Sequence, residues 1–230
     1  MQRMSVELIV LDDERTAAEH AGRFLAEAAR AGGHIALSGG KSPEYAHETA
    51  AELQPDWSGV ELWWGDERCV PPDDENSNFG MAKRTLLDGL SIQPRVVHRI
   101  RGEADPEEAA AEYNAALQDV RLSLNLLGIG PDGHTASLFP NAPGLDERKR
   151  LAIAAAAGLD PLVPRVTMTP PMLARSDVVL FLVTGEAKAE AAAKAFAGPA
   201  SAATPASLIR AADGETIGIL DRAAAALLEI

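Results

Sequence analysis

The feature of this chain that most limits its possible folds is an alternation of two kinds of segment. Short apolar runs, typical of buried strands, alternate with longer alanine-rich stretches whose apolar residues recur at helical spacing. Such an alternation predicts a parallel sheet with helices on both faces. We therefore expect an α/β fold, a single three-layer α/β/α Rossmann-like domain that spans residues 1–230 and has a mainly parallel sheet.

The two kinds of segment can be placed along the chain. The predicted strands are residues 8–11, 34–37, 60–64, 96–100, 122–128, 151–155, 178–183 and 216–220. The predicted helices are residues 13–31, 43–53, 77–89, 105–119, 186–197 and 221–229. Two of these helices have start signals, because Ser42 and Asp105 each place a side-chain oxygen at the expected N-cap, directly before a proline.

The charge balance narrows the possible partners. Against 21 Lys and Arg stand 34 Asp and Glu, a net charge of −13, which argues against nucleic acid or an anionic membrane as the main partner. A local cluster of donors could still bind a small anion. The one cysteine, Cys69, excludes an intramolecular disulfide and fits a reducing compartment. No segment approaches the ~20 apolar residues of a membrane span, so we expect a cytoplasmic protein.

A glycine pair follows the second predicted strand, in the segment LSGGKSPEY (37–45). Ligands of parallel sheets bind at the carboxyl ends of the strands. Gly39 and Gly40 would let backbone N–H groups approach an anion at the start of a helix, and Lys41 and Ser42 could add donors. The segment is not a P-loop or a dinucleotide fingerprint, and an ordinary tight turn remains an alternative.

Charged residues also follow two further predicted strands. Asp66 and Arg68 come directly after residues 60–64, and GIGPDGHTASLFP (128–140) brings Asp132 and His134 together after residues 122–127. An imidazole can accept a proton at neutral pH, and a neighbouring carboxylate can fix its tautomer. There is no G-x-S-x-G nucleophile elbow, and the five histidines show no metal-binding spacing. A general base is thus one reading of His134, and a structural histidine is the other.

Two cations later in the chain lie beside predicted strands. Arg165 belongs to VPRVTMTPPML (163–173), and Lys188 belongs to VTGEAKAEAAAKAF (183–196). Either could hold a phosphate, although most Lys and Arg are plain surface residues.

Taken in order, these segments resemble the glucosamine-6-phosphate isomerase/6-phosphogluconolactonase family over essentially the whole chain. The resemblance rests on LSGGKSP, WWGDERCVPPDDENSN, LLGIGPDGHTASLFP, RVTMTPPML and VTGEAKA. It implies a sugar-phosphate pocket in which Gly39, Gly40 and Ser42 cradle the substrate, with Arg165 and Lys188 as cationic partners. Asp66 and Arg68 would line the reacting end, and Asp132 with His134 would carry the chemistry. Lys41 is a departure, because the family more often has a small hydroxyl residue there.

The residue five positions after His134 separates the two activities of the family. The deaminases carry a glutamate there, whereas this chain has Phe139, which cannot titrate. The resemblance therefore implies hydrolysis of 6-phospho-D-glucono-1,5-lactone to 6-phospho-D-gluconate, in the oxidative pentose phosphate pathway. Water activated by a general base would attack, with no covalent intermediate, metal or organic cofactor. The alternatives are the deaminase and a non-catalytic sugar-phosphate sensor. We expect a monomer or a small homo-oligomer.

Overall fold

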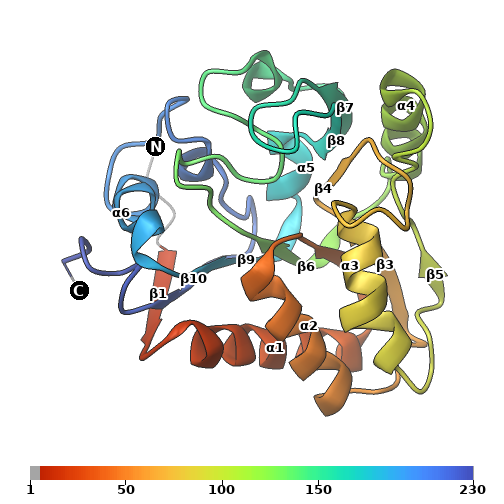
Figure 1. Cartoon of the computed structure of the whole chain (residues 1–230), viewed down its shortest axis with the longest axis horizontal. Coiled ribbons are helices and arrows are strands. Elements are labelled where there is room, and N and C mark those ends of the chain that lie inside the picture. Colours follow the sequence, from red (N-terminus) through yellow and green to blue (C-terminus); the bar gives the residue numbers. More distant parts are fainter. Residues whose placement is uncertain (1–5, 230) are drawn as a thin grey trace.

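The computed structural model, which describes residues 6–229, has a central parallel sheet of seven strands (Figure 1). Every neighbouring pair in this sheet is parallel. In spatial order its strands are β1 (Val6–Leu11), β10 (Glu215–Asp221), β9 (Ser176–Val183), β6 (Leu122–Leu127), β2 (Gly33–Leu37), β3 (Val60–Trp64) and β5 (Val96–Val97). The predicted α/β fold with a mainly parallel sheet is confirmed.

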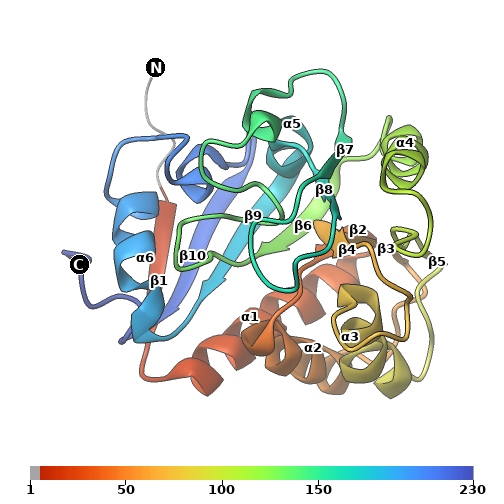
Figure 2. The ribbon, with the colours of Figure 1, turned by 45° about the horizontal axis from the view of Figure 1, so that its top comes forward.

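Helices cover both faces of this sheet. In chain order they are α1 (Glu14–Ala31), α2 (Lys41–Leu53), α3 (Asn78–Thr85), α4 (Pro106–Ala116), α5 (Pro170–Ala174) and α6 (Ala189–Phe196). Short 3-10 helices lie at Leu87–Gly89, Pro143–Asp146, Glu186–Lys188 and Pro205–Leu208. Figure 2 shows α1, α2 and α3 beneath the sheet and α5 above it, and in Figure 1 α6 lies on the side of the sheet away from α1. The arrangement is the expected three layers.

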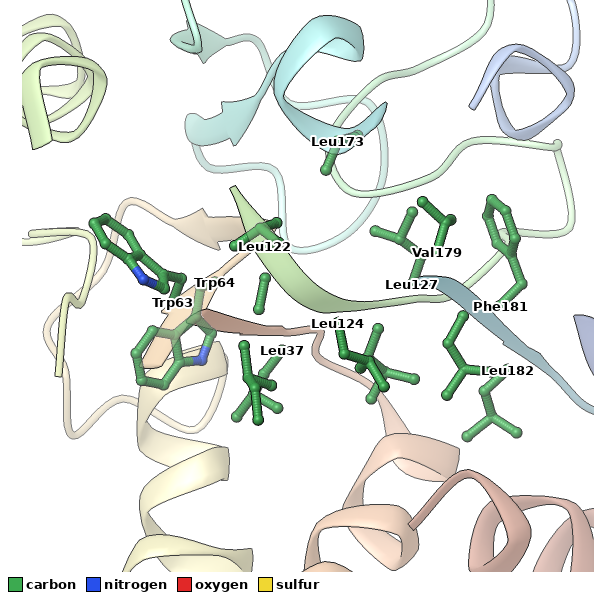
Figure 3. Close-up of a cluster of buried hydrophobic side chains, with 14 of the residues drawn as sticks. Leu37, Trp63, Trp64, Leu122, Leu124, Leu127, Leu173, Val179, Phe181 and Leu182 are labelled. Carbon is green, nitrogen blue, oxygen red and sulfur yellow. The ribbon is translucent and has the colours of Figure 1, made fainter. Parts of the chain in front are cut away.

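The middle strands are apolar along their length because both of their faces are buried. In β6, Leu122, Leu124, Leu126 and Leu127 are all covered, and their side chains pack against those of β2, β3 and β9 (Figure 3). Asn125, a fully buried polar residue of β6, donates its Nδ2–H to the backbone oxygen of Leu173 (3.1 Å). A continuous apolar run is the pattern of a doubly covered parallel strand.

A second, antiparallel sheet of three strands was not expected. It consists of β4 (Asp66–Arg68), β8 (Arg165–Met168) and β7 (Ala152–Ala155). The predicted strand at 151–155 therefore exists, but it belongs to this sheet. Two of the predicted site residues pair across it, since Arg68 lies opposite Arg165 in the register. The small sheet thus brings together side chains that are distant in the sequence.

Two local predictions were wrong. No helix forms at residues 221–229. Asp221 is the last residue of β10, and the residues after it form turns, in which one bond from Ala225 N to Asp221 O is followed only by bonds between residues three apart. Ser42 is not the N-cap of α2: the helix begins at Lys41, Gly40 occupies the cap position, and no side chain caps it. The cap predicted at Asp105 is confirmed, since its Oδ1 accepts from the backbone N–H groups of residues 107 and 108.

Candidate active site

A cavity of about 270 Å³ opens at the carboxyl edge of the central sheet. Its walls come largely from the loops after β2, β3, β6 and β9, which are four consecutive strands of the sheet. This volume is at the small end for ligand pockets and suits a small molecule. The lining includes all of the predicted site residues except Asp132: Gly39, Gly40, Lys41, Ser42, Asp66, Arg68, His134, Arg165 and Lys188.

His134 and Asp132 form a hydrogen-bonded pair at this cavity. The ring Nδ1 of His134 lies 2.6 Å from Oδ1 of Asp132, which also accepts the backbone N–H of His134 (3.1 Å). A carboxylate only accepts hydrogen bonds, so Nδ1 carries the proton and the neutral ring keeps its lone pair on Nε2. Partial burial of Asp132 works in the opposite direction, but the bonds from His134 hold the pKa of this carboxyl below its ordinary value. The pair therefore has the tautomer of a general base.

The glycines of this loop make the pair possible. A Cβ on Gly130 would lie 1.9 Å from Nδ1 of His134 and 2.7 Å from Oδ1 of Asp132, so only a residue without a side chain leaves room. Gly133 has a φ of 87°, a conformation that favours glycine, and a Cβ there would press against Thr204. The glycines of the segment Gly-Pro-Asp-Gly-His therefore leave the space that the contact between Asp132 and His134 requires.

Asp66, another residue of the cavity lining, is held by two neutral side chains. Its Oδ2 accepts from the hydroxyl of Ser137 (2.6 Å), and Nδ2 of Asn78 donates to the Asp66 backbone oxygen (2.9 Å). Asn78 also packs on Gly39, where a Cβ would lie 1.9 Å from Asn78 Oδ1. Asn78 therefore joins the glycine loop after β2 to the acid after β3.

Arg68 and Arg165 place positive charge in the same cavity. Arg165 is only 3% exposed, and its Nη2 donates to the backbone oxygens of Leu159 (3.1 Å) and Pro161 (3.0 Å). Burial, and then the neighbouring charge of Arg68, lower the pKa of Arg165, while Asp66 raises it. A guanidinium nevertheless stays protonated. The two arginines therefore bring positive charge to the cavity that suits an anion, beside the carboxylates of Asp66 and Glu67.

A third cation, Lys188, lies near the His134–Asp132 pair. Its ammonium donates to the backbone oxygen of Ile129. Burial lowers the pKa of Lys188, whereas the charges of Asp132 and Glu14 act in the opposite direction. Lys41 differs, because its side chain is 71% exposed and pairs with Glu14 at 3.9 Å. Lys188 is therefore the better-placed lysine for a ligand inside the cavity.

Buried polar atoms without a protein partner collect around this cavity. Among the described residues they include Ser38 Oγ, Asn78 Oδ1 and both Nε and Nη1 of Arg165, all on lining residues. An unpartnered buried polar group costs about 1–3 kcal/mol, and functional sites are where proteins tolerate that cost. The free guanidinium N–H groups mark the Arg165 wall as a place that can accommodate an anionic ligand.

Phe139 occupies the position that decides between the two expected activities. Its ring centroid lies 5.1 Å from that of His134, and it lines the cavity. On its other side the ring packs on Gly158, where a Cβ would lie 2.4 Å from Phe139 Cγ. An apolar, non-titrating side chain thus stands directly beside the imidazole.

Several residues of the cavity were not expected from the sequence. They include Asn78, Gly130, Ser137 and Thr184. Asn78 and Ser137 do lie within the motif segments, but nothing local shows that they contact Asp66. Gly130 could have been suspected from the density of glycines before His134; Thr184 follows an apolar strand and carries no other signal.

Among residues 6–229, no three His, Cys, Asp or Glu side chains gather so that they could hold a metal ion. Within the same residues, none of the helices has the length and apolar character to cross a membrane.

The fold and the cavity together define a class of protein: an α/β domain with a hydrogen-bonded Asp–His pair and two arginines at the carboxyl edge of its sheet. Comparison with known families identifies this class. Residues 12–218 match the family of glucosamine-6-phosphate isomerases/6-phosphogluconolactonase. The chain belongs to this family.

Individual relatives agree with this assignment. The 6-phosphogluconolactonase of Haemophilus influenzae is 36% identical over 85% of this chain and 87% of its own length. That of Mycobacterium leprae is 36% identical over 97% of this chain and 98% of its own length. Among solved structures, 6-phosphogluconolactonase from Trypanosoma brucei superposes with a TM-score of 0.87 at 25% identity, covering 98% of this chain and 99% of that one.

Proposed function

We propose that this chain hydrolyses 6-phospho-D-glucono-1,5-lactone to 6-phospho-D-gluconate. The observation that carries the proposal is the His134–Asp132 pair, with Nε2 as the free basic nitrogen, in a cavity that also holds Arg165 and Lys188. The names of the relatives support the same reaction. The whole chain acts as one sugar-phosphate lactonase domain, and the core shared by all its layers supports this.

The phosphate of the substrate anchors the reaction. It binds at the backbone of Gly39 and Gly40, at the N-terminus of α2, with Arg165 and Lys188 supplying positive charge. The unpartnered N–H groups of Arg165 support this role. Anchoring one end of the molecule places its lactone carbonyl near His134 and removes much of the entropic cost of the attack.

The chemistry then needs one base and one oxyanion donor. Nε2 of His134 takes a proton from water as its oxygen attacks the carbonyl carbon, and Asp132 stabilises the imidazolium. Arg68 or a backbone N–H receives the developing oxyanion. As the bond between the carbonyl carbon and the ring oxygen breaks, His134 returns the proton to that oxygen. Asp66, fixed by Ser137, orients Arg68 or binds a sugar hydroxyl. No step requires a metal or an organic cofactor.

The deaminase of the same family is the competing activity, and Phe139 argues against it. Opening the sugar ring and moving protons between carbons requires a further titratable group at this position, and a phenyl ring supplies none. Lactone hydrolysis needs only the base and donors already described. A non-catalytic sensor would bind the phosphate equally well, but it would have no need of an oriented His134–Asp132 pair.

The proposal also covers the setting of the protein. A cytoplasmic location and a monomer or small homo-oligomer accompany this activity, and the negative charge of the chain supports small-molecule rather than nucleic-acid partners.

The test is hydrolysis of freshly made 6-phosphoglucono-δ-lactone, measured above its spontaneous rate. His134→Ala should lose roughly 10²–10⁴-fold in kcat with little change in thermal stability, because the side chain lies in a loop and is not part of the core. His20→Ala, which removes a ring on α1 outside the cavity lining, is the matched control. Near-wild-type turnover of His134→Ala would disprove the assigned base, and an inactive wild type would leave the sensor as the better explanation.

A further inference from the structure

Glu14 stands behind the wall of the cavity, and no feature of the sequence singled it out. It is the first residue of α1 and is not itself part of the cavity lining. It nevertheless contacts or faces the proposed phosphate-binding side chains. Its Oε1 accepts from the Ser42 hydroxyl (3.0 Å), its Oε2 lies 3.9 Å from Nζ of Lys41, and its charge acts on Lys188.

The protons of two hydroxyls on the cavity wall are directed by this carboxylate. Ser42 Oγ lies 3.0 Å from Glu14 and 2.6 Å from Thr184 Oγ1. Each hydroxyl has one proton, and the carboxylate can only accept. Both contacts are satisfied only when Thr184 donates to Ser42 and Ser42 donates to Glu14. The two protons then point toward Glu14, so Thr184 presents lone pairs, and no donor, to the cavity.

A phosphate group requires the opposite arrangement. Its oxygens accept hydrogen bonds, so Thr184 must turn its proton into the cavity to bind it. Ser42 must then donate to Thr184 instead of Glu14, because two oxygens at 2.6 Å need a proton between them. When the direction of these hydrogen bonds is reversed, Glu14 loses its hydroxyl donor. It also leaves a negative carboxylate close to the incoming dianion.

We propose that Glu14 is a positioning residue that weakens phosphate binding through the chain Glu14–Ser42–Thr184. This rests on the proposed function, since it assumes that the phosphate lies at this end of the cavity. An opposing carboxylate shortens the residence of a product that carries the same phosphate as the substrate. The residue therefore affects affinity and release, and it leaves the chemistry at His134 unchanged.

The first test is Glu14→Gln, which preserves the size of the side chain. Its amide N–H can donate to Ser42, so Ser42 can donate to Thr184 and the Thr184 proton is free to point into the cavity. The negative charge is also removed. Removal of the unit charge and release of the Thr184 donor should together change the affinity by about five- to tenfold. Glu14→Gln should therefore bind inorganic phosphate and 6-phosphogluconate about five- to tenfold more tightly in calorimetry. Its affinity for gluconate, which has no phosphate, should be unchanged.

Two further variants separate this mechanism from a general loss of charge. Glu19→Gln is the matched control, because Glu19 lies on the same helix and pairs with Arg15 on the surface; it should leave both affinities unchanged. In a Thr184→Val background no hydroxyl can reverse, so Glu14→Gln should tighten phosphate binding by clearly less than in the wild type.

Each outcome bears on one proposal or the other. The proposed hydrogen-bond chain Glu14–Ser42–Thr184 is supported if Glu14→Gln binds phosphate more tightly, binds gluconate with unchanged affinity, and gains less in the Thr184→Val background. Equal affinities of wild type and Glu14→Gln, or an equal gain in the Thr184→Val background, overturn it. Binding is measured without turnover, so an inactive wild type that still binds phosphate more tightly after Glu14→Gln would reject the lactonase and retain the role of Glu14.

Discussion

Substitution of Gly130 by alanine is the sharpest test of how the catalytic pair is built. The added methyl group would lie 1.9 Å from Nδ1 and 2.0 Å from Cε1 of His134, and 2.7 Å from Oδ1 of Asp132. No real Cβ tolerates such distances, so the ring must rotate away. The imidazole is free to do this, because 22% of it is exposed, but it then loses the carboxylate that sets its tautomer.

The expected effect falls on catalysis and hardly on stability. A correctly positioned base contributes roughly 10²–10⁴-fold, or about 3–5 kcal/mol of the activation barrier, and Gly130→Ala should lose a large part of this in kcat. KM should change little, since the cations of the phosphate end are untouched. The partly exposed pair contributes about 1 kcal/mol or less to folding, and alanine for glycine returns about 0.4–1 kcal/mol, so the two effects nearly cancel.

The neighbouring glycine provides the control. A Cβ on Gly128 would meet no atom within 4 Å, although this residue lines the same cavity. Gly128→Ala should therefore keep kcat within about threefold of the wild type. Both variants are assayed for hydrolysis of 6-phosphoglucono-δ-lactone and for thermal unfolding. The reasoning fails if Gly130→Ala retains wild-type kcat, or if Gly128→Ala is impaired to the same extent.

Three further predictions follow from the hydrogen bonds and burial described above. Asp132→Asn should lose at least about 10²-fold in kcat, because its amide can donate to Nδ1 and so leave the proton on Nε2; recovery of activity at any pH up to 9 would contradict this. Arg165→Met should raise KM for the phosphorylated lactone at least tenfold and leave binding of gluconate unchanged, whereas equal losses for both ligands would remove Arg165 from the phosphate site. Burial lowers the pKa of His47 to about 3, so this ring is neutral when folded but takes up a proton when unfolded below about pH 6.5. Stability should therefore fall by about 1.4 kcal/mol per pH unit as the pH drops from about 6.5 toward 3, and His47→Leu should flatten this slope in urea unfolding at pH 7, 6 and 5; parallel slopes would refute the assignment.

The parallel sheet could be predicted because its strands are buried on both faces. Segments such as Val178–Val183 are then apolar without interruption, and the pattern is local. The strand Asp66–Arg68 has no such pattern: it is short and fully charged, and it exists because it pairs with Arg165–Met168. Pairing between distant segments leaves no periodicity in either one, so the second sheet could not be read from the sequence.

The candidate site divides in the same way. Asp132 and His134 lie two residues apart, so their proximity was visible in the sequence, and the structure brings them to 2.6 Å. The contribution of Asn78 was not visible, because it depends on the packing of its amide against Gly39. The sequence predicts Ser42 as a helix cap, yet its hydroxyl bonds to the side chains of Glu14 and Thr184. Residue types predicted the chemistry, and only the tertiary contacts showed what supports it.

The order of strands in the central sheet has a consequence for how activity appears during folding. The cavity is walled by loops that follow β2, β3, β6 and β9, and β6 joins the other strands from the middle of the sheet. These strands are far apart along the chain, so their pairing closes long loops and is expected to be slow. No half of the chain contains a complete cavity. After dilution from denaturant, turnover should therefore recover more slowly than the circular-dichroism signal of the helices. The rate of this recovery would report when the strands of the central sheet have paired.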